Sequence, residues 1–279
     1  MKKYALGLYE KSMPKELCWE KKLTEVKKAG FDYLEISIDE TEEKLERLVM
    51  SQKERLSLVK TMRRIGVPFG SMCLSGHRKY PFGSSDPAAE ARSMEIMEQA
   101  IALAADLGIR TIQLAGYDVY YEDSTEDTKK RFLKNLKKAT EMAAKAGVTM
   151  GFETMENDFM NTVEKAMGYV KFVDSPYLHV YPDSGNITNA AKTYGKDVLK
   201  DIETGAGHMV ALHLKETVPG KFREIPFGTG HVDFTAMIGK AWELGVRRFV
   251  TEFWYTGSEK WKEDLVFANN MMREILDRQ

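Results

Sequence analysis

The sequence predicts a (β/α)8 TIM barrel, a closed ring of eight parallel strands covered by eight helices, formed as one domain over residues 1–279. Eight short β-rich segments alternate with eight longer segments of helical period. The length suits one barrel of about 250 residues, and the 43% share of apolar residues suits a large core. An open doubly wound sheet shares this alternation. That class normally has a glycine-rich phosphate loop after its first strand, where this chain reads GLYEKSMP.

In chain order, the expected strands cover residues 4–8, 33–38, 67–74, 110–116, 148–153, 177–183, 208–214 and 247–253. The first helix follows from an apolar stripe that ends at Gly30, and the second from the cap pair Ser51 and Glu54. A helix that ends near Leu107 follows the Gly-, Pro- and Ser-rich segment SGHRKYPFGSSDP. The helix over 125–145 has a charged outer face and stops at Gly147. The remaining helices are expected near 160–173, 190–204, 233–244 and 260–276.

Composition argues against several partners. Forty-one basic and 42 acidic side chains give a formal charge of −1, so no overall field attracts nucleic acid or an anionic membrane. No apolar run reaches the length of a signal peptide core or of a membrane span, and we expect a cytoplasmic protein. Cys18 and Cys73 lack CxxC spacing and are expected to be free thiols.

Four polar residues each close a short apolar run, and they lie 30, 30 and 39 positions apart. They are Glu153, Asp183, His213 and Glu252. In a barrel the carboxyl ends of the strands meet at one mouth, so these side chains should converge there. Their oxygen and nitrogen donors suit a divalent metal ion (Mn, Zn, Mg or Co), and the lack of a thiolate argues against a closed structural zinc site. Taken singly, each carboxylate can also cap the next helix, and the histidine can be a core residue.

The same residues allow more than one reaction. Glu153 and Glu252 come from strands that lie three apart in order, so they can face opposite sides of a small ligand. Such a pair can remove a proton from one face and return a proton to the other, as epimerisation next to a carbonyl requires. Hydrolysis by a metal-activated water would use the same ligands. The ligands alone therefore leave the reaction open.

Longer motifs carry a family resemblance over nearly the whole chain. They are LGLYEK, ISIDET, SMCLSGHRKYPFGS, IQLAGYDVYY, YPDSGN, HLKET and PFGTGHVDF. With them the chain resembles the xylose-isomerase-like barrels, and within these it is very similar to the L-ribulose-5-phosphate 3-epimerases, also called L-xylulose-5-phosphate 3-epimerases. It departs from the family pattern where ETME replaces an EIMD-like segment and where DSGN replaces DIGN, which puts Ser184 beside Asp183.

The resemblance implies a metal-dependent isomerase. It would interconvert L-xylulose 5-phosphate and L-ribulose 5-phosphate by removing and returning the C3 proton through a metal-stabilised enediolate. Metal ligation would fall to the four strand-end residues, and acid/base work to Glu153 and Glu252. A role in pentose and L-ascorbate catabolism and a homodimer are implied by the resemblance only.

A phosphorylated ketopentose also requires donors at the mouth. Cationic or imidazole groups in the strand-three and strand-seven loops are candidates for the phosphate, namely His77, Arg78, Lys221 and Arg223. Lys215 should share a side of its strand with His213 and reach a substrate oxygen, and Asn186 can reach a sugar hydroxyl. The alternatives are an epimerase or isomerase of an unphosphorylated ketose, a metal-dependent phosphodiesterase or endonuclease, and a sugar-phosphate-binding protein without turnover.

Overall fold

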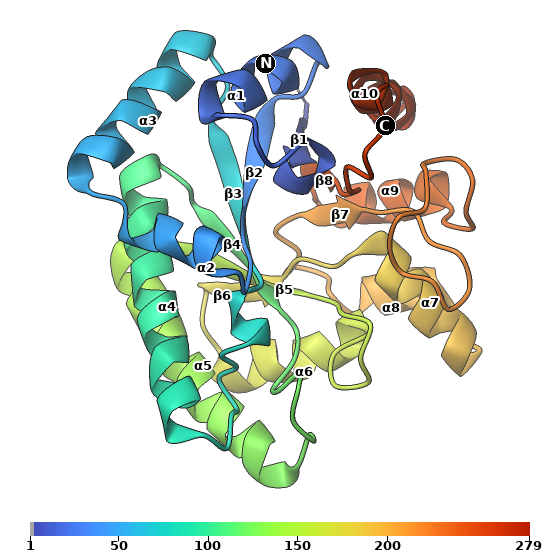
Figure 1. Ribbon diagram of the computed structural model, residues 1–279. Helices are drawn as coiled ribbons and strands as arrows, with labels where there is room; N and C mark the ends of the chain where they lie inside the picture. The colour runs from blue at the N-terminus through green and yellow to red at the C-terminus, as the bar shows by residue number, and fades with distance from the viewer. Residues whose placement is uncertain (1–2) are drawn as a thin grey trace.

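The structure is a computed structural model that describes residues 3–279, and it has eight parallel strands in one curled sheet (Figure 1). The strands are β1 (Ala5–Tyr9), β2 (Tyr33–Ile38), β3 (Phe69–Leu74), β4 (Thr111–Ala115), β5 (Thr149–Glu153), β6 (Leu178–Val180), β7 (Leu212–Leu214) and β8 (Arg248–Thr251). Their order in the sheet is β6-β5-β4-β3-β2-β1-β8-β7. Two parallel bridges, Val180 to Met209 and Asp183 to His213, join the outer strands β6 and β7 and close the ring. The predicted (β/α)8 TIM barrel is confirmed.

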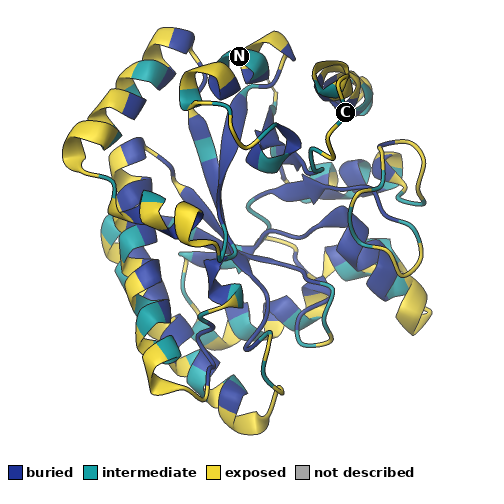
Figure 2. Cartoon of the chain, viewed as in Figure 1, coloured by how far each residue is buried: buried dark blue, intermediate teal, exposed yellow. Residues whose placement is uncertain are grey.

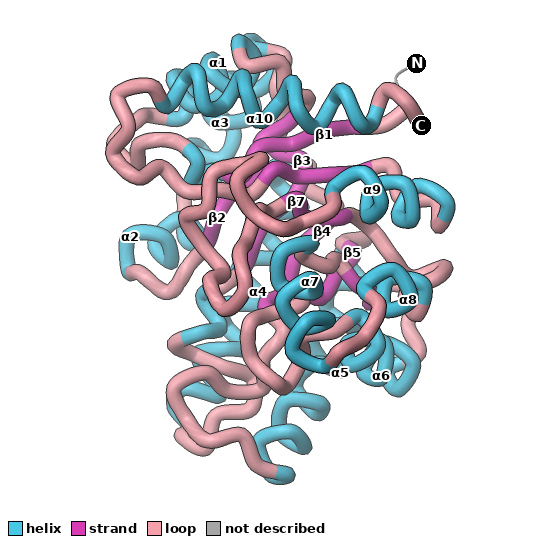
Figure 3. The backbone as a smooth tube through the Cα atoms, turned by 90° about the vertical axis from the view of Figure 1, so that its right-hand side faces the viewer, coloured by secondary structure: helices cyan, strands magenta, loops and turns pink. Residues whose placement is uncertain are grey.

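Ten α-helices cover the described part of the barrel. They are α1 (Trp19–Lys28), α2 (Glu42–Leu45), α3 (Gln52–Ile65), α4 (Pro87–Leu107), α5 (Glu126–Ala146), α6 (Val163–Val173), α7 (Ser184–Tyr194), α8 (Val198–Glu203), α9 (Phe234–Glu243) and α10 (Trp261–Leu276). Short 3-10 turns η1 (Glu10–Ser12), η2 (Glu46–Val49) and η3 (Gly76–Arg78) lie in the loops after β1 and β3 and between α2 and α3. Figure 3 shows the helices and loops wrapped around the strands.

Local sequence signals explain where most helices begin and end. Ser51 and Glu54 form the expected capping box at the start of α3, and Thr125 caps α5. Gly66 and Gly147 end these helices in the left-handed conformation, with φ of 82° and 64°. Two expectations differ from the structure. Instead of a single helix at 190–204, the chain starts α7 directly at Ser184 and then forms the separate helix α8, and the short helix α2 precedes α3, so ten α-helices rather than eight are present in residues 3–279.

The core has two main parts, besides a small cluster of Ala115, Tyr117 and Met155. The larger part lies between the strands and the inner faces of the helices, and Figure 2 shows these faces buried and the outer faces exposed. The smaller part lies inside the ring and consists of Tyr9, Tyr33, Cys73, Tyr181, Ala211 and Val250. Polar side chains share this interior with it, which places ionisable groups in a low-dielectric setting at the barrel mouth. None of the helices within residues 3–279 is long and apolar enough to cross a membrane.

Candidate metal centre and active site

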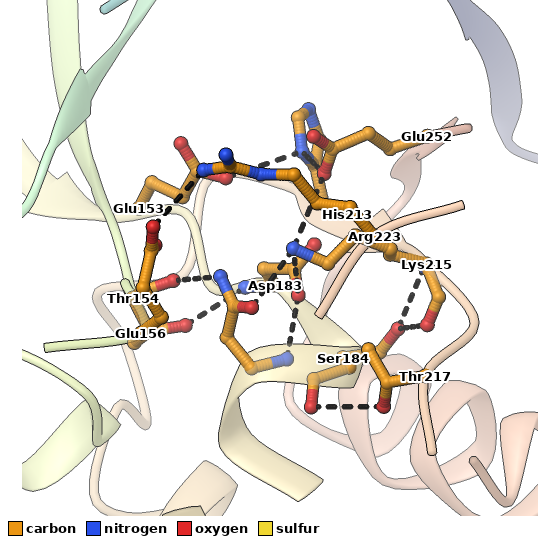
Figure 4. A network of polar contacts seen from close by, with 12 residues as sticks. Glu153, Thr154, Glu156, Asp183, Ser184, His213, Lys215, Thr217, Arg223 and Glu252 are labelled. Carbon is orange, nitrogen blue, oxygen red and sulfur yellow. Dashed lines mark hydrogen bonds and ion pairs between the residues drawn. The ribbon is translucent and has the colours of Figure 1, made fainter. Parts of the chain in front are cut away.

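The four strand-end residues do converge at one mouth of the barrel. Glu153 ends β5, Asp183 caps α7 just after β6, His213 lies in β7 and Glu252 follows β8. The bridge between Asp183 and His213 sets these two side by side, and the Glu252 N–H donates to the Leu214 carbonyl at 2.9 Å. One ligand atom from each of the four residues lies within 4.8 Å of all the others, and all four side chains are buried. Figure 4 shows Glu153 and Glu252 approaching from opposite sides.

His213 and Lys215 hold the carboxylates together. The imidazole Nδ1 lies 2.8 Å from Glu252 Oε2 and 3.9 Å from Glu153 Oε1. The Lys215 ammonium lies 3.1 Å from Asp183 Oδ1 and 4.0 Å from Glu252 Oε2. Because residues 213 and 215 occupy the same side of one extended segment, the imidazole and the ammonium enter the same group, as the sequence predicted.

Burial and mutual charge shift the titration of every member of this group. Burial, reinforced by the Glu252 carboxylate, raises the pKa of Glu153 to about 8. Burial also raises the pKa of Asp183 to about 7, against the opposing effect of Lys215. Burial opposes ionisation of Glu252 too, but Lys215 and His213 hold its pKa well below the usual range. For His213 the burial penalty is outweighed by carboxylates at Glu35 and Glu252, which raise its pKa well above the ordinary value.

The donor set fits a divalent cation. Asp183 Oδ1 already accepts from the Asn186 N–H at 2.7 Å, whereas its Oδ2 is buried without a hydrogen-bond partner among residues 3–279. When the three carboxylates are ionised and the imidazole is neutral, as metal ligation requires, the Lys215 ammonium leaves two negative charges that a dication would balance. Three oxygen donors and one imidazole nitrogen are ligands that Mn²⁺, Zn²⁺ and Co²⁺ accept. Glu153, Asp183, His213 and Glu252 can therefore hold a metal ion.

A cavity of about 150 Å³ opens above this group. Its lining residues are Tyr9, Lys11, Asp39, Glu40, Thr41, Cys73, Ser75, Arg78, Glu153, Met155, Glu156, Asn186, Lys215, Arg223, Glu252 and Trp254. Glu153 and Glu252 thus face both the candidate metal position and the space that a ligand would fill, while Asp183 and His213 are the more deeply buried pair.

Of the six expected substrate-binding residues, four line this cavity. Lys215 and Asn186 are joined, because the Lys215 ammonium donates to Asn186 Oδ1 at 2.8 Å. At the rim, Arg78 lies over the Tyr120 ring at 4.6 Å. Arg223 pairs with Glu156 at 3.0 Å, and Figure 4 shows it reaching across toward the strand-five side of the mouth.

The other two expected residues lie apart from the cavity. His77 is buried, with Nε2 3.1 Å from the Ser93 carbonyl and its ring 4.3 Å from that of Phe82. It precedes Arg78 in the 3-10 turn η3, where successive side chains point about 120° apart. Lys221 sits exposed in a tight turn, bridged through its backbone to Val218.

Two candidate functional residues were not predicted from the sequence. Lys11, in η1, lines the cavity and pairs with Asp39 at 2.6 Å. Glu35, in β2, contacts His213 Nε2 at 2.6 Å and is fully buried. The sequence could have indicated Glu35, since an acidic residue inside a mainly apolar strand needs a buried partner. Lys11 gave no such signal, because a lysine in a loop is usually solvated.

Known proteins match this chain along its length. The profile of the xylose isomerase-like TIM barrel family matches residues 23–271. L-ribulose-5-phosphate 3-epimerase UlaE of Escherichia coli (strain SMS-3-5 / SECEC) is 46% identical over 233 residues, which are 84% of this chain and 81% of that protein. The protein of that name from Shigella sonnei (strain Ss046) is 42% identical over 273 residues, 98% of this chain and 95% of that one.

Solved structures share the fold. A D-tagatose 3-epimerase-like protein superposes with a TM-score of 0.80 at 17% identity, covering 98% of this chain and 97% of its own. The structure of an L-ribulose 3-epimerase gives a TM-score of 0.76 at 20% identity, covering 99% and 94%. At these identities the likeness supports the barrel alone.

The barrel, its acidic centre and these relatives together identify the class of protein: it is an isomerase on a xylose isomerase-like TIM barrel. Within that class, the chain belongs to the family of L-ribulose-5-phosphate 3-epimerases.

Proposed function

We propose that this protein is a metal-dependent 3-epimerase that interconverts L-ribulose 5-phosphate and L-xylulose 5-phosphate. The observation that carries the proposal is the position of Glu153 and Glu252, which enter one cavity from opposite sides. One ligand atom from each of them lies within 4.8 Å of ligand atoms of Asp183 and His213. The relatives that cover most of the chain are named for the same activity.

The proposed reaction moves one proton on each face of C3. One glutamate takes the C3 proton and the other delivers a proton to the opposite face, so the configuration inverts and no atom is gained or lost. A divalent ion held by Glu153, Asp183, His213 and Glu252 supplies Lewis acidity that favours the enediolate form of a 2-keto sugar. Mn²⁺, Zn²⁺, Mg²⁺ and Co²⁺ are the candidates.

Lys215 has a positioning part in this proposal. Its ammonium is fixed between Asp183 Oδ1 and Asn186 Oδ1 at the floor of the cavity. From there it can donate to a substrate oxygen without moving far, while the Asn186 side chain, anchored by its Nδ2 on the Thr154 carbonyl at 2.7 Å, holds the lysine in place.

The substrate phosphate needs cations at the rim. Arg78 and Arg223 line the cavity and present guanidinium groups that suit phosphate oxygens, and Lys11 adds a third cation. We therefore assign the phosphate to this rim. His77 and Lys221 have no part in this assignment, because neither lines the cavity.

The test uses protein stripped of metal by a chelator and then supplied with each of the four ions. Proton and phosphorus NMR follow L-ribulose 5-phosphate, with free L-ribulose as a matched substrate that lacks the phosphate. We expect L-xylulose 5-phosphate to form only after metal is restored, and free L-ribulose to react much more slowly. Release of inorganic phosphate would instead identify a hydrolase, and equal turnover of both sugars would contradict the phosphate assignment.

We also propose that the enzyme is a cytoplasmic homodimer, as the family resemblance implies. Light scattering on purified protein tests the dimer, and the expected mass is twice the chain mass of 31.8 kDa.

A further inference from the structure

Glu35 lies outside the ligand set, yet it contacts one of its members. It sits in the middle of β2, its side chain is fully buried inside the barrel, and its Oε1 lies 2.6 Å from His213 Nε2. The other ring nitrogen, Nδ1, faces Glu252 at 2.8 Å and Glu153 at 3.9 Å. Each nitrogen of this imidazole therefore has its own carboxylate, and only Nδ1 faces the ligand set.

The Glu35 carboxylate is held in one orientation by contacts from β3, β7 and the residue that follows β6. Its Oε2 accepts from the Ser71 hydroxyl at 2.6 Å and from the Tyr181 hydroxyl at 3.0 Å. Ser71 is its register partner on β3, and Tyr181 follows β6. The Tyr181 ring also packs edge-on against the His213 ring, with 5.0 Å between centroids. Glu35 and His213 thus form a fixed pair inside the ring.

The contact between Glu35 and His213 determines which ring nitrogen carries a proton when a metal ion binds. An imidazole that binds a metal through one nitrogen carries its proton on the other. A carboxylate only accepts, so the imidazole of the metal-free protein carries a proton on each nitrogen, one toward Glu35 and one toward Glu252. A metal ion would displace the Nδ1 proton, and the Glu35 contact would keep the other proton on Nε2, so that the Nδ1 lone pair is directed at the ligand set. Without an acceptor at Nε2, the proton could move to Nδ1, where Glu252 would accept it and the ligand lone pair would be lost.

We propose that Glu35 is a positioning residue of the metal centre: it fixes the tautomer and the ring orientation of His213, so that Nδ1 binds the metal ion. This inference rests on the proposed metal-dependent function. It assigns a role to a residue that touches neither the metal position nor the cavity.

The first arm of the test measures metal affinity. Metal-stripped wild type and Glu35→Gln are titrated with Zn²⁺ and Mn²⁺ against a fluorescent chelator, and the melting temperature of each metal-free protein is recorded. The glutamine has the same shape, and the Ser71 and Tyr181 hydroxyls can turn to accept from its amide. Because the amide is neutral and a weaker acceptor, we expect the affinity to fall about 10- to 100-fold, with little change in metal-free melting temperature.

A matched control comes from the same barrel interior. Gln113 on β4 is fully buried, its amide has no hydrogen-bond partner in the described chain, and it pairs in register with Cys73, which lines the cavity. Gln113→Leu should leave the metal affinity within about threefold of wild type. A Glu35→Gln protein that binds metal as tightly as wild type would overturn the positioning role.

The second arm needs no variant and so does not depend on how well Glu35→Gln folds. Zinc-loaded wild type labelled with ¹⁵N at histidine should show, for His213, a protonated Nε2 and a metal-shifted Nδ1. Metal at Nε2, or a proton at Nδ1, would overturn the inference. If wild type binds no metal in the first arm, the proposed metal-dependent function fails, and this inference fails with it.

Discussion

The Lys215 ammonium lies 3.1 Å from Asp183 Oδ1, and both side chains are buried beside the candidate metal position. An ion pair at this depth is costly to break, because the remaining charge keeps its desolvation penalty. Before a metal ion binds, the Lys215 ammonium and the His213 imidazole both supply positive charge beside the three carboxylates, which share one small space.

Removing this ammonium should destabilise the metal-free protein. We expect Lys215→Met to lower the free energy of unfolding by about 3 kcal/mol, because Asp183 loses its buried partner. Urea unfolding with and without Zn²⁺ measures this, and metal should restore part of the loss. A metal-free Lys215→Met protein as stable as wild type would show that the carboxylates do not depend on the lysine.

Arg223 should distinguish phosphorylated from free sugars. Arg223→Met removes a guanidinium from the cavity rim, and we expect KM for L-ribulose 5-phosphate to rise about tenfold or more, with little effect on free L-ribulose. Lys221→Met is the matched control, since this cation lies in the same loop but outside the cavity. Steady-state kinetics measure KM for both variants. Equal changes in KM would show that Arg223 does not bind the phosphate.

The pH dependence of stability should report on His77. Burial lowers its pKa to about 4, so the folded state binds fewer protons than the unfolded state between about pH 6.5 and 4. This contribution to stability is complete above pH 6.5 and is lost as the pH falls toward 4, by about 3 kcal/mol. His77→Leu should flatten this part of the unfolding curve and leave KM for the phosphorylated sugar unchanged. An increase in KM would instead indicate that His77 takes part in substrate binding.

A buried ionic cluster around Glu10, in the turn η1 after β1, should contribute to the free energy of unfolding. Glu10 accepts from Lys22 and Lys44 at 2.7 Å each and from Arg47 at 2.8 Å. Although burial opposes ionisation, these three cations hold the pKa of Glu10 well below its usual range. The stability that it adds is therefore present above the unfolded pKa, near 4.5, and lost only as the pH falls through its lower folded value.

Neutralising Glu10 leaves three cations without their shared carboxylate. We expect Glu10→Gln to lower the free energy of unfolding by about 3–5 kcal/mol at neutral pH. Glu20→Gln serves as the control, since it breaks the exposed pair with Arg64 and should change little. Guanidinium unfolding measures both variants, and similar small effects in the two would contradict a structural role for the cluster.

The sequence allowed the barrel and the convergence of the four strand-end residues to be predicted for one physical reason. Parallel strands bring their carboxyl ends to one face, so polar residues at consecutive strand ends must meet. The start of α7 was missed because Gly185 in DSGN lowers helix propensity, whereas in the structure Asp183 caps the helix through the Asn186 N–H.

The positions of single loop side chains could not be predicted in this way. His77 and Arg78 are neighbours, yet His77 packs against Phe82 and Arg78 lines the cavity. Their different directions depend on the conformation of η3 and on packing from distant segments. Lys11 likewise lines the cavity beside Asp39, which comes from the loop after β2 and pairs with it. Such contacts join loops that sequence order does not connect.

Glu153 and Glu252 are proposed to act as a pair on the two faces of one carbon, and deuterium exchange tests this pairing most directly. Metal-loaded wild type, Glu153→Gln and Glu252→Gln are each incubated with L-xylulose 5-phosphate in D₂O and followed by proton NMR, after metal content is checked in all three. Wild type should place deuterium at C3 as L-ribulose 5-phosphate appears, and each metal-loaded variant should lose conversion by a factor of about 10² or more. Undiminished conversion in either metal-loaded variant would contradict the two-carboxylate account.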